Sequence, residues 1–450
     1  MQPEMQVESC PDSSRGSKMQ VPALPHPRWT GATKIAFRFG FVYFGLYNLH
    51  TALYLLAFPP FTRLSALYEA MWGKTVPWVS KHVLHLTHSF GTDYLNTGSG
   101  SKDTTFAFVQ VFCFLVLAAA AALVWSLVDR KRREYRWLYG WFVVYLRLSL
   151  AAALIPYGAV KLFPMQFPPP TPFQLLQPSG LLAPRQLLWL SMGASASYTF
   201  FGGLMEVSAG LLLAVPQLAT LGALLSTAVM VNVLMLNVGY DVAVKLFTIN
   251  LILMGLVILL PDVARLIDFF VFNRSVPAAP RRPLFRRKSL NQAVVVLQIA
   301  FGIVLLSYDV YRAHEIATQK VLSKNTPLYG IWLVDDYQVD GRPIAALSSD
   351  AHRWQRMIVN SSDNAVVQVM TGAFSSLHLR ADSHSDSLVL TQAGNPNWIA
   401  ELAYDNSRPG SLVLTGKMGG LPVEIRLHRE DLSKFPLSNP TIHWVNDGDK

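Results

Sequence analysis

Residues 221–260 read LGALLSTAVMVNVLMLNVGYDVAVKLFTINLILMGLVILL. Two apolar runs, each close to the ~20 residues that cross a bilayer as a helix, flank one polar turn that contains Asp241 and Lys245. A soluble domain carries about 25% charged residues, whereas this chain of 450 residues is 51% hydrophobic and 15% charged. The stretch and the composition together predict a membrane protein of several helices, with the Asp241 turn at a membrane surface.

Apolar segments of spanning length recur along the first two thirds of the chain. The seven predicted transmembrane helices lie near 35–57, 105–127, 138–161, 195–215, 218–240, 244–262 and 292–312. A shorter piece before the fourth, RQLLWLSMG at 185–193, contains Trp189 and suits the headgroup zone. The proline-rich loop at 164–180 is predicted to run as extended, semi-rigid chain.

Lysines and arginines gather in the loops after the second and the sixth segments. Residues 130–136 hold five of them and 263–291 holds a second arginine-rich cluster, whereas 59–103 holds four and 164–186 holds one. Because basic loops stay on the cytoplasmic side, we predict a bacterial inner-membrane protein with its N-terminus in the cytoplasm and its C-terminus outside.

The net charge of +10 comes from the part of the chain before residue 325, where 28 basic residues outnumber 14 acidic ones. These basic residues lie in short clusters between apolar segments. They therefore favour an anionic lipid bilayer, and not nucleic acid, as the partner.

Residues 325–450 have a different pattern. Eight short stretches alternate apolar and polar residues, from GIWLVDDYQV at 330–339 to PVEIRLHRE at 422–430, with turn residues between them. This pattern predicts an all-β domain, either a small antiparallel barrel or a sandwich. The Gly-x-Trp triplet at 330–332 resembles the opening of a lipocalin and favours the barrel.

The predicted fold class is an α-helical polytopic membrane protein with a C-terminal all-β domain. Its regions are a disordered cytoplasmic tail (1–33), two helices joined by an outer loop at 59–103 (34–137), a four-helix core (138–262), a basic cytoplasmic loop (263–291), a seventh helix with its linker (292–324) and an extracytoplasmic β domain (325–450).

Charged residues inside the apolar segments are the first candidates for a site. Arg147 lies about halfway along the third segment and Glu206 about halfway along the fourth, at ~1.5 Å of rise per residue. A lone charge at that depth is costly, so we predict that the two side chains pair, with Gly202 and Gly210 admitting a neighbouring helix. Such a pair either fixes helix packing or belongs to a polar site.

Other polar residues crowd the outer halves of the third to sixth segments. Asn232 and Asn250 are predicted to hydrogen-bond across the fifth and sixth segments, and Asp103 to cap the second. Asp241 either caps the sixth helix or belongs to a polar cavity that is open to the outside. The predicted ligand-binding residues of that cavity are Arg147, Tyr157, Lys161, Glu206, Asn232, Tyr240, Asp241, Lys245 and Asn250.

The stretch YLRLSLAAALIPYGAVKLFPMQF at 145–167 resembles the start of a DoxX-like membrane protein, with Arg147 in its first core helix and Lys161 at the outer end. The glycine-rich segment around Glu206 and the turn NVGYDVAVKL at 237–246 fit the same pattern. The resemblance covers about 138–262 and implies a four-helix membrane bundle. Some family members are subunits of a thiosulfate:quinone oxidoreductase, so it implies a quinone as ligand and, in any catalysis, the role of an accessory subunit.

The sequence offers no motif for a covalently bound cofactor. It contains no dinucleotide glycine pattern and no CxxC pair, and we interpret His82, His85 and His88 as ordinary histidines of an interfacial helix, not as a metal site. We therefore expect a redox-associated membrane protein that binds a quinone or another small amphiphile. The alternatives are a small-solute transporter, favoured by charges at mid-membrane, and a scaffold whose β domain recruits an extracytoplasmic protein partner.

Overall fold

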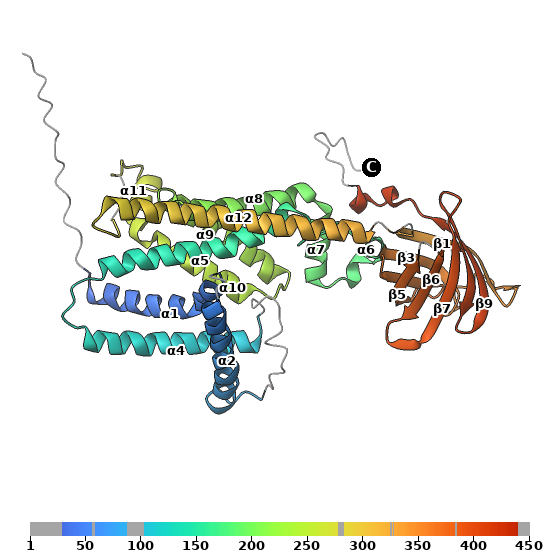
Figure 1. Ribbon diagram of the computed structural model, residues 1–450, viewed down its shortest axis with the longest axis horizontal. Helices are drawn as coiled ribbons and strands as arrows, with labels where there is room; N and C mark the ends of the chain where they lie inside the picture. Colours follow the sequence, from blue (N-terminus) through green and yellow to red (C-terminus); the bar gives the residue numbers. More distant parts are fainter. Residues whose placement is uncertain are drawn as a thin grey trace, which may run out of the picture.

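The computed structural model describes residues 29–55, 59–87, 103–277, 283–324, 326, 328–382 and 385–439. Within them, a bundle of long helices and an antiparallel β-barrel lie end to end (Figure 1). This arrangement confirms the predicted fold class. Residues 1–28 of the predicted tail (1–33) lie outside the described residues.

Six helices in the described part of the chain are long and apolar enough to cross a bilayer. By length and composition, they make the chain a multi-pass membrane protein. They are α4 (Thr105–Val128), α5 (Arg136–Leu162), α8 (Ala196–Ala214), α9 (Ala219–Gly239), α10 (Lys245–Leu259) with η2 (Leu260–Asp262) and α11 (Val263–Phe270), and α12 (Lys288–Lys324). Each matches one of the predicted segments.

The first predicted segment forms α1 (Gly31–Leu55), which is not one of these six. It lies alongside α4 and α5 in the bundle (Figure 1). Its polar side chains lower its hydropathy, but they form hydrogen bonds inside the helical bundle. Tyr43 donates to Asn250 of α10 over 2.6 Å, and Asn48 donates to the Met254 sulfur over 3.3 Å. A seventh crossing by α1 therefore stays a prediction.

The predicted outer loop at 59–103 begins with a helix, α2 (Pro59–His82), that runs steeply across α1 and α4 (Figure 1). Leu64 and Leu67 leave one side of α2 exposed and apolar, while Trp72 is buried against the bundle. Such a helix suits the interface between lipid and water. The histidine segment was predicted to form such a helix, but α2 ends at His82 and His85 lies beyond it.

The two basic loops lie at the same end of the bundle. Trp137 Nε1 donates to the Leu284 carbonyl over 3.1 Å, and the rings of Trp141 and Phe285 have centroids 5.6 Å apart. The barrel lies at the opposite end (Figure 1). The loops are thus arranged as the topology requires, and the assignment of this end to the cytoplasm stays a prediction.

The C-terminal domain is a closed barrel of eight antiparallel strands, because the last strand pairs back with the first. All eight predicted strands are present, so the barrel is confirmed and the sandwich is wrong. The short β2 (Arg342–Pro343) pairs antiparallel with the end of β1. The barrel strands are β1 (Gly330–Val339), β3 (Trp354–Ser361), β4 (Asn364–Val369), β5 (Phe374–Asp382), β6 (Ser387–Gln392), β7 (Asn395–Asp405), β8 (Ser411–Met418) and β9 (Leu421–Arg429).

Inward-facing apolar side chains fill the barrel. Leu412, Leu414 and Ile425 are each 0% exposed, as the alternation along β8 and β9 requires. Eight strands enclose a space just wide enough for side chains to fill. Trp332, from the Gly-x-Trp triplet, is buried in the same core, and the Arg429 guanidinium lies 6.0 Å from its ring centroid.

A short helix from the proline-rich loop joins the bundle to the barrel. This helix, α6 (Pro172–Leu176), begins with a capping box and a proline, so the extended chain predicted for 164–180 is partly helical. Phe173 of α6 packs on the outer face of the barrel over Ile331 and Ile358. The barrel is therefore held against the loop that follows α5.

Candidate functional site

A cavity of about 400 Å³ lies between α5, α8, α9 and α10 and is covered by α7 (Pro184–Ala194). This volume is within the range of pockets that hold small molecules. Most of its wall is apolar. The lining side chains that carry polar groups are Tyr157, Lys161, Gln166, Trp189, Tyr198, Glu206, Asn232, Asn237 and Thr248.

Lys161 and Glu206 form a buried ion pair in the wall of this cavity. Lys161 Nζ lies 2.6 Å from Glu206 Oε2 and also donates to the Tyr157 carbonyl over 3.2 Å. Glu206 is 2% exposed and Lys161 is 9% exposed. Charges at such positions persist when they are paired, so the pair places one compact polar group in an apolar cavity.

The predicted pair of Arg147 with Glu206 is wrong. Arg147 donates from Nε and Nη2 to the Leu213 carbonyl, over 2.9 and 2.6 Å. Leu213 lies in the last turn of α8, where carbonyls lack partners within the helix and attract cations. Because α5 has 27 residues and α8 has 19, α8 ends near Arg147, and the antiparallel register brings Lys161 to Glu206.

Glycines let α5 and α8 approach closely. A Cβ atom at Gly203 would lie 2.7 Å from the Gly158 carbonyl oxygen, and one at Gly210 would lie 2.6 Å from the Ile155 side chain. The predicted helix contact is therefore right for Gly210. It is wrong for Gly202, whose Cβ position has no atom within 4 Å and which lines the cavity instead.

The predicted hydrogen bond between Asn232 and Asn250 is also wrong. Asn250 is buried and accepts from Tyr43 of α1, while Asn237 donates to Thr248 over 3.0 Å across α9 and α10. Asn232 precedes Asn237 by five residues and so lies on another face of α9. It is exposed at the rim of the cavity.

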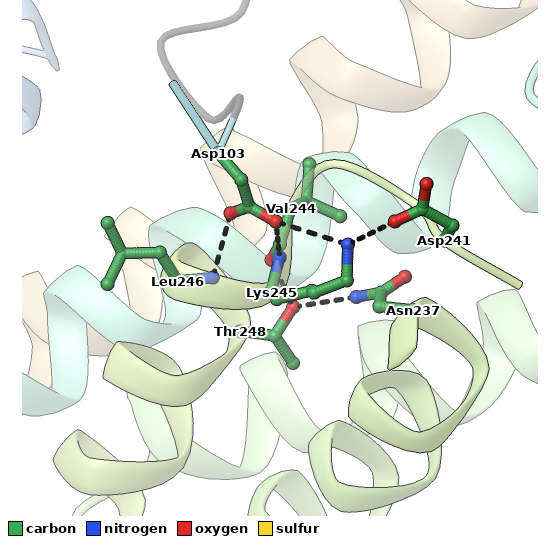
Figure 2. Close-up of polar contacts among 7 residues, drawn as sticks. All are labelled: Asp103, Asn237, Asp241, Val244, Lys245, Leu246 and Thr248. Atoms are coloured by element: carbon green, nitrogen blue, oxygen red, sulfur yellow. Dashed lines mark hydrogen bonds and ion pairs between the residues drawn. The ribbon is translucent and has the colours of Figure 1, made fainter. Parts of the chain in front are cut away.

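Asp103, from the segment just before α4, holds the turn between α9 and α10 (Figure 2). Its two carboxylate oxygens accept the backbone N–H groups of Lys245 and Leu246, each over 2.9 Å. Asp103 therefore caps α10. The predictions that Asp241 caps this helix and that Asp103 caps α4 are wrong, since Thr104 caps α4.

Asp241 and Lys245 form an ion pair at this turn, and Lys245 Nζ also lies 3.7 Å from Asp103 Oδ2 (Figure 2). Their ion pair measures 2.8 Å, and the Asp241 side chain is 85% exposed. The hydrogen bond from Lys245 holds the pKa of the Asp241 carboxyl below its usual range. Of the predicted ligand residues, Tyr157, Lys161, Glu206 and Asn232 line the cavity, whereas Arg147, Tyr240, Asp241, Lys245 and Asn250 do not.

Asp103→Ala is expected to lower the free energy of unfolding by about 1–2 kcal/mol, because it removes the acceptor of two N–H groups. Thermal unfolding of the detergent-purified protein measures this loss. Asp241→Asn is the control, and we expect no measurable change, because the Asp241 side chain is 85% exposed and asparagine tolerates the φ of 50° at this position. Equal losses in the two variants would contradict the capping role of Asp103.

No group of three or more His, Cys, Asp or Glu side chains in the described ranges could hold a metal ion. His82 stacks on Trp78, with ring centroids 5.2 Å apart, and His85 is exposed. His88, the third histidine of this segment, lies outside the described residues. The chemistry that the cavity itself offers is the binding and orientation of a ligand beside an ammonium–carboxylate pair.

The cavity wall made by α7 and the chain before it was not predicted from the sequence. Phe167, Leu188 and Met192 are buried together and line the cavity. The residue that could have indicated this wall is Gly193, where a Cβ atom would collide with the Pro168 carbonyl. A glycine at that point lets α7 close over the proline-rich loop.

No protein-family model matches the chain. A protein of Bacillus subtilis (strain 168), described as "Uncharacterized protein YwoB", is 30% identical to it over 125 residues. The alignment covers 28% of this chain and 79% of the Bacillus protein. No solved structure matches the chain.

Proposed function

The chain belongs to the same family as the uncharacterized protein YwoB, and we propose that its helical bundle binds a quinone or another small amphiphile in the cavity around Lys161 and Glu206. In this proposal the protein is a DoxX-like, redox-associated component of the bacterial inner membrane. Its barrel lies outside the cytoplasm, and any catalytic role is that of an accessory subunit.

The buried ion pair in an apolar cavity is the observation that carries this proposal. An ammonium group has three N–H donors, and the described acceptors of Lys161 are Glu206 and the Tyr157 carbonyl. The third donor is available to a carbonyl or hydroxyl oxygen of a ligand. Apolar lining residues such as Val233 and Leu251 would enclose the hydrocarbon part.

Decylubiquinone, a short-chain quinone, is expected to raise the unfolding temperature of the detergent-purified protein. At a concentration of 100 times Kd, a ligand that binds the folded state stabilises it by about 2.7 kcal/mol. The double variant Lys161→Met, Glu206→Gln keeps the side-chain volumes and leaves no unpaired charge, and it should lose this shift.

The matched control is the double variant Arg312→Met, Glu315→Gln, which removes an exposed pair of α12 outside the cavity. It should keep the full shift. Absence of a shift in the parent protein, or the same shift in all three proteins, would show that this cavity does not bind the quinone.

A further inference from the structure

Among the described residues that line the cavity, those that are exposed lie on α8 and α9. Tyr198 and Phe201 on α8 are 51% and 54% exposed, and Ala228 and Asn232 on α9 are exposed as well. The remaining lining residues are buried or half-buried, including those of α7 at the barrel end. The cavity therefore reaches the surface of the bundle between α8 and α9.

This slot follows from the way the two helices pack. Near the connection between them they are in close contact, since a Cβ atom at Gly222 would lie 2.7 Å from the Leu213 amide nitrogen. Towards the barrel end the space between them opens, and a Cβ atom at Gly202 would meet nothing within 4 Å. α8 and α9 thus diverge from a tight turn.

The slot faces lipid. Both helices are apolar enough to cross a bilayer, and their outward faces carry exposed apolar residues such as Leu204 and Met235. The outward face of a spanning helix lies against hydrocarbon, not water. A molecule that passes between α8 and α9 therefore comes from the bilayer.

Asn232 is an unusual residue for such a face. It lies seven residues before the end of α9 at Gly239, or about 10 Å along the axis. In the described part of the chain its side chain makes no hydrogen bond. A polar group without a partner in hydrocarbon is costly, and the polar end of a bound lipid would supply the missing partner.

We infer that the ligand enters the cavity from the bilayer through the slot between α8 and α9, and that it is an uncharged lipid whose polar end carries a carbonyl or hydroxyl oxygen. This inference rests on the proposed function. Of the described residues in the lining, Lys161 and Glu206 are the charged ones, and they neutralise each other at 2.6 Å. A charged headgroup would enter without a counter-charge, which is strongly unfavourable in a buried site.

Photo-crosslinking in phosphatidylcholine vesicles tests the slot, with hexadecanol that carries a diazirine and an alkyne as the probe. In the parent protein we expect labelled peptides from both walls of the cavity. Gly202→Trp should abolish this labelling, because the indole would occupy the open space between the helices. Leu204→Trp, at an exposed position of α8 outside the lining, is the matched control and should be labelled like the parent.

Asn232→Leu gives a second readout that does not depend on how a large side chain packs. It should reduce labelling of the cavity, while Val231→Leu, at an exposed neighbouring position outside the lining, should not. If the parent is labelled and both Gly202→Trp and Asn232→Leu remain labelled to the same extent, entry by the slot is wrong and the cavity site stands. If cavity peptides of the parent are not labelled, the amphiphile site itself is wrong.

Discussion

Glu206→Gln is expected to lower the free energy of unfolding by about 3–5 kcal/mol, the cost of leaving one member of a buried ion pair without its partner. Lys161 would keep its charge at a site that is 9% exposed. The loss is measured from unfolding of the detergent-purified protein with increasing sodium dodecyl sulfate.

The double variant Lys161→Met, Glu206→Gln should recover most of this loss, because it leaves no unpaired charge. Glu315→Gln is the control, since its pair with Arg312 is exposed and should contribute less than about 1 kcal/mol. A loss for Glu206→Gln no larger than that of the control would contradict the buried pair.

Gly203→Ala is expected to have the second large effect. The new Cβ atom would lie 2.7 Å from the Gly158 carbonyl oxygen and 2.8 Å from Lys161 Cβ. Overpacking of this kind costs about 1–3 kcal/mol, and here the colliding atoms belong to the backbone or lie next to it, so they cannot move away freely.

The adjacent Gly202→Ala is its matched control. Its Cβ position has no atom within 4 Å, and alanine favours a helix over glycine by about 1 kcal/mol. Thermal unfolding should therefore show a lower midpoint for Gly203→Ala and an unchanged or higher one for Gly202→Ala. The reverse order would contradict the close contact between α5 and α8.

The barrel was predictable because each strand carries its own signal. Alternation from residue 330 to 429, with turn residues between the strands, predicts all eight barrel strands. The choice between barrel and sandwich depends on whether β9 pairs with β1, which is a long-range contact. The Gly-x-Trp triplet at 330–332 favoured the correct alternative.

Six of the seven predicted transmembrane helices lie where the sequence predicts them, but the register between them was not predictable. The lengths of the apolar runs predict the ends of α5 and α8 to within a few residues. The difference in length between these two helices, however, decides whether Arg147 or Lys161 lies opposite Glu206. The sequence correctly indicates that Arg147 and Lys161 share one face of α5, since both contact α8.

The predictions of the helix caps were wrong for a related reason. Asp103 and Asp241 each precede a helix in the sequence, and local capping rules assign each to the helix that follows. Asp103 instead reaches α10, which is 142 residues away along the chain. A capping contact between distant segments leaves no local signal, so the wall of the cavity near this turn could not be derived from the sequence.

Mass spectrometry of the small molecules that co-purify with the protein in mild detergent shows whether the cavity around Lys161 and Glu206 holds an amphiphile. We expect a quinone or another uncharged amphiphile to co-purify with the parent protein and to be lost from the double variant Lys161→Met, Glu206→Gln. If both proteins carry nothing beyond bulk lipid, the ion pair serves helix packing alone and the proposed ligand site is wrong.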